Sequence, residues 1–133
     1  MEFEKDFSEI TRLIEKARYN ALKSVNVELI NLYWQIGEYI SKKVESAAWG
    51  KSIVRNLSDY LNQTMPDFKG FSSQNIWRMK QFYECYKDHE KLSTLLRELS
   101  WSSHLHILSK TKTIEEKEFY LRLTVKEKYS VRE

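Results

Sequence analysis

The chain has 133 residues, of which 41% are apolar, 14% aromatic and 31% charged, so a disordered chain is excluded and one domain of ordinary size is expected. Only 3 glycines and 1 proline are present, too few turn residues for a β-sandwich or β-barrel. No apolar run approaches the roughly 18 residues of a membrane-spanning helix, the first residues lack a signal-peptide pattern, and a single cysteine, Cys85, excludes an internal disulfide. We therefore expect an all-α single domain over residues 1–133 that is cytoplasmic and has no membrane partner.

The net charge of +3 comes from 22 basic and 19 acidic residues. The excess lies in residues 51–87, which hold six basic and three acidic side chains. Such a mild excess is usual for a solvated surface and does not by itself imply nucleic acid. The choice among partners therefore depends on the motifs.

The first third of the chain has helical spacing. Asp6 and Glu9 stand at the distance of a capping box, which predicts a helix that begins at Asp6. Residues 24–27 offer competing side-chain hydrogen bonds, so the helix either breaks there or continues into an apolar stretch over 29–40. Gly37 within that stretch costs about 1 kcal/mol relative to alanine, which indicates close packing of another helix. Apolar residues at steps of three and four are expected to form an inward face before the break: Phe7, Ile10, Ile14, Ala17 and Ala21.

A helix-turn-helix-like element is expected at residues 52–87. Its first helix must end near Met65, because the following proline disfavours helix in the residue before it. Ser72 has the position of an N-cap for a second helix that reaches about residue 87, and Phe71 and Ile76 have the positions of a hydrophobic staple. The intervening linker is longer than the three- to four-residue turn of a tight helix-turn-helix.

The C-terminal third also has helical patterns. Short helices are expected over 88–99 and 101–109, and Thr113 with Glu116 forms a second capping-box pair that opens a helix to about residue 128. No segment alternates at the two-residue period of a strand. The core candidates of the last helix are Phe119, Tyr120 and Leu123.

Residue patterns that would carry catalysis are missing or misplaced. His104 and His106 are two residues apart and would point to different faces of a helix, and no glycine-rich phosphate loop or nucleophile elbow occurs. The strings Pro66-Asp67 and Glu115-Glu116-Lys117 give a formal P-D and E-x-K pair, but they fall in a turn and at the start of a helix rather than on adjacent strands. We expect no catalytic residue, no metal, no cofactor and no small-molecule substrate.

The outer face of the helix after Ser72 suits DNA. Arginine and amide side chains can bind base edges, and serines at a helix N-terminus can bind phosphate. Asn75 lies nearer the apolar side, where packing or capping is the alternative, and an exposed Trp77 would instead favour an interface with a protein or a second copy. The candidate DNA-contacting residues are Lys51, Lys69, Ser72, Ser73, Gln74, Asn75, Trp77, Arg78, Lys80 and Gln81.

Several strings resemble the YhcG family of bacterial proteins. Residues 32–37, LYWQIG, resemble its L-Y-W-x-I-G signature, and residues 70–83, GFSSQNIWRMKQFY, resemble G-F-S-x-x-N-L-x-x-M-R-x-F-Y. Residues 99–104, LSWSSH, match L-S-W-S-H with one extra serine. Residues 118–120 and 129–133 resemble E-F-Y followed by W-S-V-R-E, with Tyr129 in place of tryptophan. The order and spacing hold over nearly the whole chain.

The resemblance implies an N-terminal, mainly helical domain of the helix-turn-helix or winged-helix kind, followed in the family by a restriction-type PD-(D/E)XK nuclease domain. This chain stops where that domain would begin, so the resemblance implies that the catalytic carboxylates are absent. Residues 88–102 read as helix and give no β wing. We expect a DNA-binding or targeting module of a nuclease-associated protein, non-catalytic by itself; the alternative is a dimerisation or partner-docking domain without DNA contact.

Overall fold

A computed structural model describes residues 3–132, with side chains to residue 128; Met1, Glu2, Glu133 and the side chains of the 129–133 string lie outside this description. The described residues contain no strand, so the all-α prediction is confirmed and a β wing is missing from this part of the chain. The elements in chain order are α1 (Glu4–Glu45), α2 (Lys51–Thr64), α3 (Ser73–Tyr86), the 3₁₀ turn η1 (Glu90–Leu92), α4 (Ser93–Glu98), α5 (Trp101–Lys110) and α6 (Ile114–Arg132).

Helix α1 is continuous over 42 residues, or about 63 Å at 1.5 Å per residue. It passes through residues 24–27 without a break, because Asn26 does not compete for its own backbone: its Nδ2 donates to the carbonyl oxygens of Arg97 (3.1 Å) and Leu99 (2.9 Å). The capping-box prediction at Asp6 is wrong, since the helix begins at Glu4 with no side-chain cap.

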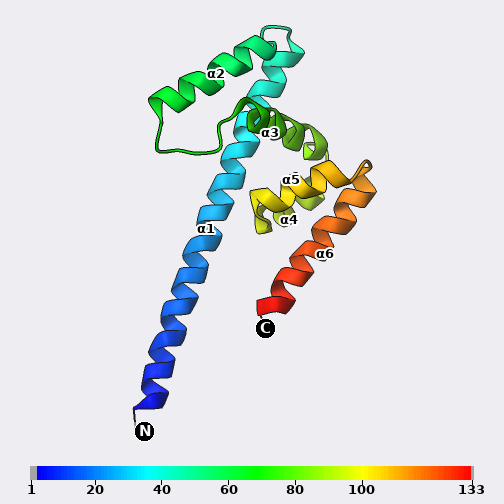
Figure 1. Ribbon diagram of the computed structural model, residues 1–133. Helices are drawn as coiled ribbons and strands as arrows, with labels where there is room; N and C mark the ends of the chain where they lie inside the picture. The colour runs from blue at the N-terminus through cyan, green and yellow to red at the C-terminus, as the bar shows by residue number, and fades with distance from the viewer. Residues whose placement is uncertain (1–2, 133) are drawn as a thin grey trace.

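The other helices gather around the second half of α1, and its first half projects beyond them (Figure 1). Ile30, Tyr33 and Ile40 are buried in the second half. The predicted inward face of the first half is therefore wrong: Phe7 is 62% exposed and Ile10 is 55% exposed. Periodicity correctly identified residues that share a face, but no element of the described chain covers that face.

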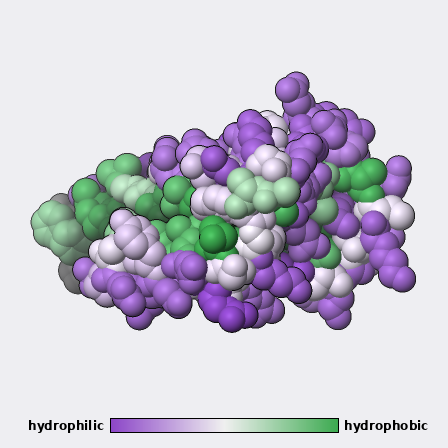
Figure 2. All heavy atoms as spheres, turned by 90° about the horizontal axis from the view of Figure 1, so that it is seen from above, coloured by the Kyte–Doolittle hydropathy of each residue, from purple (hydrophilic) through white to green (hydrophobic). Residues whose placement is uncertain are grey.

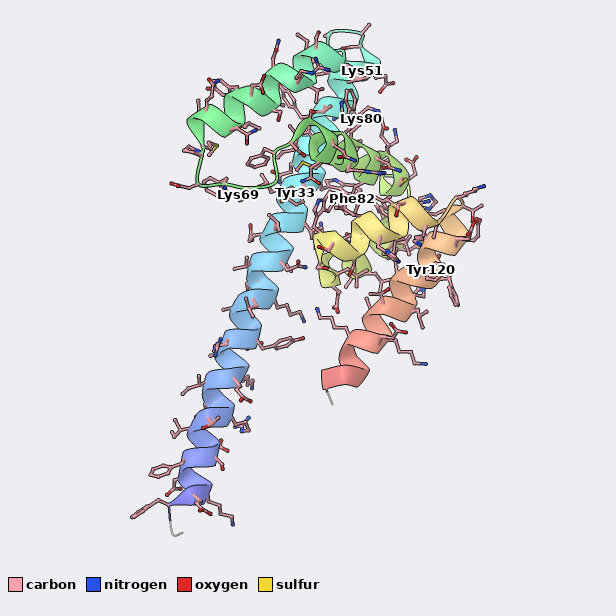
Figure 3. All side chains as sticks on the ribbon, in the orientation of Figure 1. Tyr33, Lys51, Lys69, Lys80, Phe82 and Tyr120 are labelled. Atoms are coloured by element: carbon pink, nitrogen blue, oxygen red, sulfur yellow. The ribbon has the colours of Figure 1, made fainter. Side chains whose placement is uncertain are left out.

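Helix α3 crosses α1 at Gly37, as the sequence predicted. A Cβ atom built on Gly37 would lie 2.1 Å from the carbonyl oxygen of Met79, so the two backbones touch only because glycine has no side chain. Farther along α3, Phe82 is fully buried among aromatic rings, with centroid distances of 5.7 Å to Trp34 and 5.3 Å to Trp101. Figure 3 labels Phe82 where α3 meets the second half of α1.

Both predicted caps outside α1 are present. Ser72 is the N-cap of α3, and its Oγ accepts from the backbone N–H of Asn75 at 3.1 Å. Thr113 and Glu116 bond reciprocally at the start of α6, with the Glu116 N–H donating to Thr113 Oγ1 at 3.2 Å. Phe71, beside the first cap, is buried, and its carbonyl oxygen accepts from Ser58 Oγ of α2 at 2.6 Å.

Helices α4, α5 and α6 close the core on the far side of α3. Among the described side chains of α6, Leu121 is fully buried, whereas Phe119, Tyr120 and Leu123 are exposed, so the core prediction for this helix is wrong. Figure 3 shows Tyr120 pointing away from the body. The buried cluster consists of Ile30, Phe82, Tyr86, Leu92, Leu96, Leu99, Ile107, Leu108 and Leu121.

Candidate nucleic-acid interface

Helix α3 is enclosed by its neighbours rather than presented on the surface. Helices α1, α2 and α5 all contact it, and within residues 73–86 only Gln74 and Glu84 are exposed. A recognition helix that enters the major groove needs one long free face. Of the two exposed positions, Gln74 lies near the N-terminal end of α3 and the acidic Glu84 near its C-terminal end, so the N-terminal part of the helix is the candidate for contact with DNA.

Asn75 has a structural role at that end. Its Nδ2 donates to the carbonyl oxygen of Gly70 at 2.5 Å, and its Oδ1 accepts from Trp101 Nε1 at 2.8 Å. Gly70 has a positive φ of 96°, a conformation that side chains rarely adopt. Asn75 therefore ties the connection before α3 to the start of α5, which is the packing alternative that its position on the helix left open.

A polar hollow lies between the N-terminal half of α3 and α5. The two helices run in the same direction, so the N-caps Ser72 and Ser100 lie at the same end of the pair (Figure 1). The N-terminus of α3, whose N-cap Ser72 lines the hollow, contributes a partial positive charge there. None of the described residues that line the hollow is acidic. The polar side chains that line it are Ser72, Gln74, Asn75, Arg78, Ser102, His106 and Ser109.

Arg78 is the cationic side chain of this hollow. Its Nη1 donates to Gln81 Oε1 at 2.9 Å, which joins two of the predicted residues one helical turn apart. Both side chains are half-buried, so their stems are held by packing and their polar ends lie at the surface. Gln74, one turn before Arg78, is exposed. The prediction that Gln74, Arg78 and Gln81 share a face agrees with this arrangement.

Trp77 and Lys80 are engaged on the opposite margin of α3. Trp77 is half-buried against Ile40, Val54 and Ile76, so it is not the exposed tryptophan that would favour an interface with a protein or a second copy. Lys80 Nζ lies 2.9 Å from Glu84 Oε1 and 5.8 Å from the centroid of the Trp77 ring.

Glu84 is held as an anion beside Lys80. Burial acts to raise its pKa, but hydrogen bonds from Ser41 (2.7 Å) and Lys80 (2.9 Å) outweigh burial and leave the pKa below its ordinary value. The positive charge of Lys80 is therefore largely compensated within the fold.

The remaining predicted residues do not join one patch. Ser73 is half-buried in the first turn of α3, and Lys51 and Lys69 are exposed on other segments. Figure 3 shows Lys51 at the start of α2 and Lys69 on the connection between α2 and α3. Neither lysine lines the hollow. Sequence reasoning missed the contribution of α5. The LSWSSH string includes Ser102, but Ser102 lines the hollow only because the fold places α5 beside α3.

The buried histidine is a packing residue. His104 Nε2 lies 2.7 Å from the carbonyl oxygen of Leu96, and burial among aromatic rings lowers its pKa to about 4. Among the described residues, no three His, Cys, Asp or Glu side chains gather in a way that could hold a metal ion. No helix in the same part of the chain is long and apolar enough to cross a membrane.

The fold and the hollow thus define an all-α domain with one acid-free polar face. Residues 9–133 match the family described as the DUF1016 N-terminal domain, to which the YhcG proteins belong, and the chain is a member of this family. No curated protein and no solved structure gives a significant match to the chain.

Proposed function

We propose that this domain is a DNA-binding or targeting module that has no catalytic activity of its own. One observation carries the proposal: an arginine, amide side chains and a histidine line a hollow without carboxylates, which begins at the N-terminus of α3 and runs along α5. Phosphate groups are favoured at helix N-termini, and arginine and glutamine form the bidentate contacts that bases and phosphates offer.

The enclosure of α3 changes how such a module would bind. The N-terminal end of the helix approaches the duplex, with Ser72 and Ser73 toward phosphate and Gln74, Arg78 and Gln81 toward phosphate or base edges. His106 of α5 borders the same surface. Asn75, Trp77 and Lys80 then support the fold rather than touch DNA. With a net charge of +3, a single domain would bind non-specifically with a dissociation constant of about 10⁻⁴–10⁻⁶ M at physiological salt.

Binding of a fluorescent duplex over a salt series tests the proposal. Arg78→Ala removes a cation of the hollow, whereas Lys80→Ala removes a cation that Glu84 compensates on the opposite margin of the same helix. We expect Arg78→Ala to weaken binding and to reduce the salt slope by about 0.9, the value for one phosphate contact, while Lys80→Ala changes affinity less than about twofold. No binding by the parent at low salt, or equal losses for the two variants, would contradict the proposal.

A second function, association with another copy of the chain, is favoured by a different observation. Trp77, the residue that would mark such an interface if exposed, is half-buried against Ile40, Val54 and Ile76. The apolar residues that the first half of α1 exposes are the better candidates for this role.

A further inference from the structure

The first half of α1 carries an apolar stripe that the rest of the described chain leaves uncovered. The members of this stripe, hereafter the α1 stripe, are Phe3, Phe7, Ile10, Ile14, Ala17 and Ala21, and all six are exposed. Figure 2 shows hydrophobic side chains gathered at the left end of the molecule, where both the first half of α1 and the end of α2 lie in Figure 1. Apolar side chains that are contiguous along one helix face mark an interaction surface, in contrast to apolar residues scattered singly.

The α1 stripe points away from the body. At 100° per residue, its mean direction is about 140° around the helix from that of Ile30, Tyr33, Gly37 and Ile40, the residues packed against the body. A helix laid along the stripe therefore does not meet α3 or α6. Residues 3–18 are all exposed, and the first half of α1 projects beyond the other helices, which leaves room on this side for a long partner (Figure 1).

The spacing of the α1 stripe is that of a coiled coil. Its members alternate by four and three residues, which is a heptad repeat over almost three heptads. Residues 3–21 span about 27 Å of helix. The preferred occupant is therefore another amphipathic helix that lies nearly parallel or antiparallel to α1.

The sizes of the side chains select one orientation for a second copy. Large residues occupy the N-terminal end of the stripe, and alanines occupy its C-terminal end. In an antiparallel pair centred near residue 12, Phe3 faces Ala21 of the other copy, Phe7 faces Ala17, and Ile10 faces Ile14. Each large ring then meets a small residue, which keeps the axes at constant separation, whereas a parallel pair stacks phenylalanine on phenylalanine and alanine on alanine.

The charges select the same orientation. Residues 3–9 hold three acids and one base, and residues 10–23 hold four bases and one acid. An antiparallel pair sets the acidic first turns of each copy beside the basic second half of the other, and a parallel pair would set like beside like. The helix dipoles are also opposed in the antiparallel arrangement. We propose that the chain forms an antiparallel homodimer through the α1 stripe, with the two bodies at opposite ends.

The oligomeric state of the chain tests the proposal. Sedimentation equilibrium over a range of concentrations should show a reversible monomer–dimer equilibrium for the parent. Ile10→Glu should shift the equilibrium to monomer. Residue 10 lies near the centre of the pair, and each of the two copies brings one negative charge into the apolar contact. Ser8→Glu adds the same charge to the same exposed helix away from the stripe and should dimerise like the parent. Both positions are exposed, so circular dichroism should report unchanged helix content. A monomeric parent, or a dimer unaffected by Ile10→Glu, would overturn the proposal.

Cross-linking tests the orientation. In a Cys85→Ser background, Phe7→Cys and Ala17→Cys should form a disulfide-linked pair when the two variants are mixed and oxidised. Neither variant should link efficiently to itself, because residues 7 and 17 face each other in the antiparallel pair. Efficient self-linking by each variant, without the mixed product, would show a parallel arrangement and contradict the inference.

Discussion

Helix propensity predicts that Gly37→Ala stabilises the protein, and packing predicts that it destabilises the protein. The sign of the change in the free energy of unfolding is therefore a direct test of the fold. Alanine is better than glycine inside a helix by about 1 kcal/mol, and on propensity alone the variant should be more stable. In the structure the new Cβ would lie 2.1 Å from the carbonyl oxygen of Met79 and 2.7 Å from its carbonyl carbon. Ordinary van der Waals contact begins at 3.4 Å, or 1.3 Å farther from the oxygen, and the obstructing atoms are backbone atoms that cannot rotate away.

The magnitude follows from the separation that this clash imposes. Helices α1 and α3 must move apart by about 1 Å at their crossing, which loosens Ile40, Ile76 and Met79 around it. Overpacking of a dense core costs about 1–3 kcal/mol, and more where the backbone itself obstructs. After the gain in propensity, we expect a net loss of about 2–3 kcal/mol in the free energy of unfolding, which lowers the melting temperature by roughly 6–12 °C for a chain of this size.

Thermal or urea unfolding, followed by circular dichroism, measures this loss. Gly50→Ala is the matched control, because a Cβ at Gly50 meets nothing within 4 Å and its φ of −124° suits any residue. The control should melt within about 3 °C of the parent, since poorer capping and reduced freedom of the unfolded chain nearly cancel. A Gly37→Ala variant that melts at or above the parent would refute the described contact between α1 and α3.

Three further outcomes are expected. Phe71→Ala should lower the free energy of unfolding by about 1–3 kcal/mol through lost burial, and Ser72→Ala by about 1 kcal/mol through the lost N-cap bond; if both variants unfold like the parent, α3 does not begin at Ser73. Burial lowers the pKa of His104 to about 4, from an unfolded value of 6.5. As the pH falls, the unfolded chain therefore takes up the histidine proton before the folded chain does. The free energy of unfolding should decrease between pH 6.5 and pH 4, by about 3 kcal/mol in full. His104→Gln should remove this part of the pH dependence and His106→Gln, at an exposed site, should leave it, as pH-dependent urea midpoints would report. Supercoiled plasmid incubated with the chain and Mg²⁺ or Mn²⁺ should stay intact, and cleavage that Asp67→Ala or Glu115→Ala abolishes would contradict the non-catalytic proposal.

Local chemistry predicted the features that depend on neighbours in sequence. The N-cap at Ser72 and the capping box of Thr113 and Glu116 each depend on residues three apart, and both are present. Gly37 was informative because glycine within a helix is costly without a compensating contact, and that contact is with Met79.

Periodicity could not tell which faces are covered. The first half of α1 and the 119–123 segment of α6 both have apolar residues, yet Phe7 and Phe119 are exposed, and Leu121 is the residue that enters the core. Covering a helix face requires a second element at the right place, which is decided by the whole topology. The same limit applies to residues 24–27, where Asn26 bonds to the end of α4 instead of ending its own helix.

Part of the candidate interface was readable from the sequence. The angular position of Gln74, Arg78 and Gln81 on one helix face follows from 100° per residue. The contribution of α5 does not, because Ser102 and His106 reach the hollow only through the packing of α5 beside α3. The sequence pattern also does not show that Trp77 packs against Val54 of α2 or that Lys80 pairs with the Glu84 carboxylate.

The two proposed surfaces lie on different parts of the molecule, and together they predict how affinity should depend on the length of DNA. In an antiparallel pair centred near residue 12, the crossings of α1 with α3 at Gly37 lie about 75 Å apart along the helix axis, which corresponds to about 22 base pairs. One domain with a net charge of +3 binds DNA weakly, but when one hollow of a dimer is bound, the second is held at a high effective concentration near the same duplex, which raises the affinity.

Ile10→Glu should therefore weaken binding to duplexes longer than about 22 base pairs and leave binding to a duplex of about 12 base pairs unchanged. Arg78→Ala should weaken both without changing the mass. An equal effect of Ile10→Glu on short and long duplexes would show that the α1 stripe does not act by joining two DNA-binding bodies.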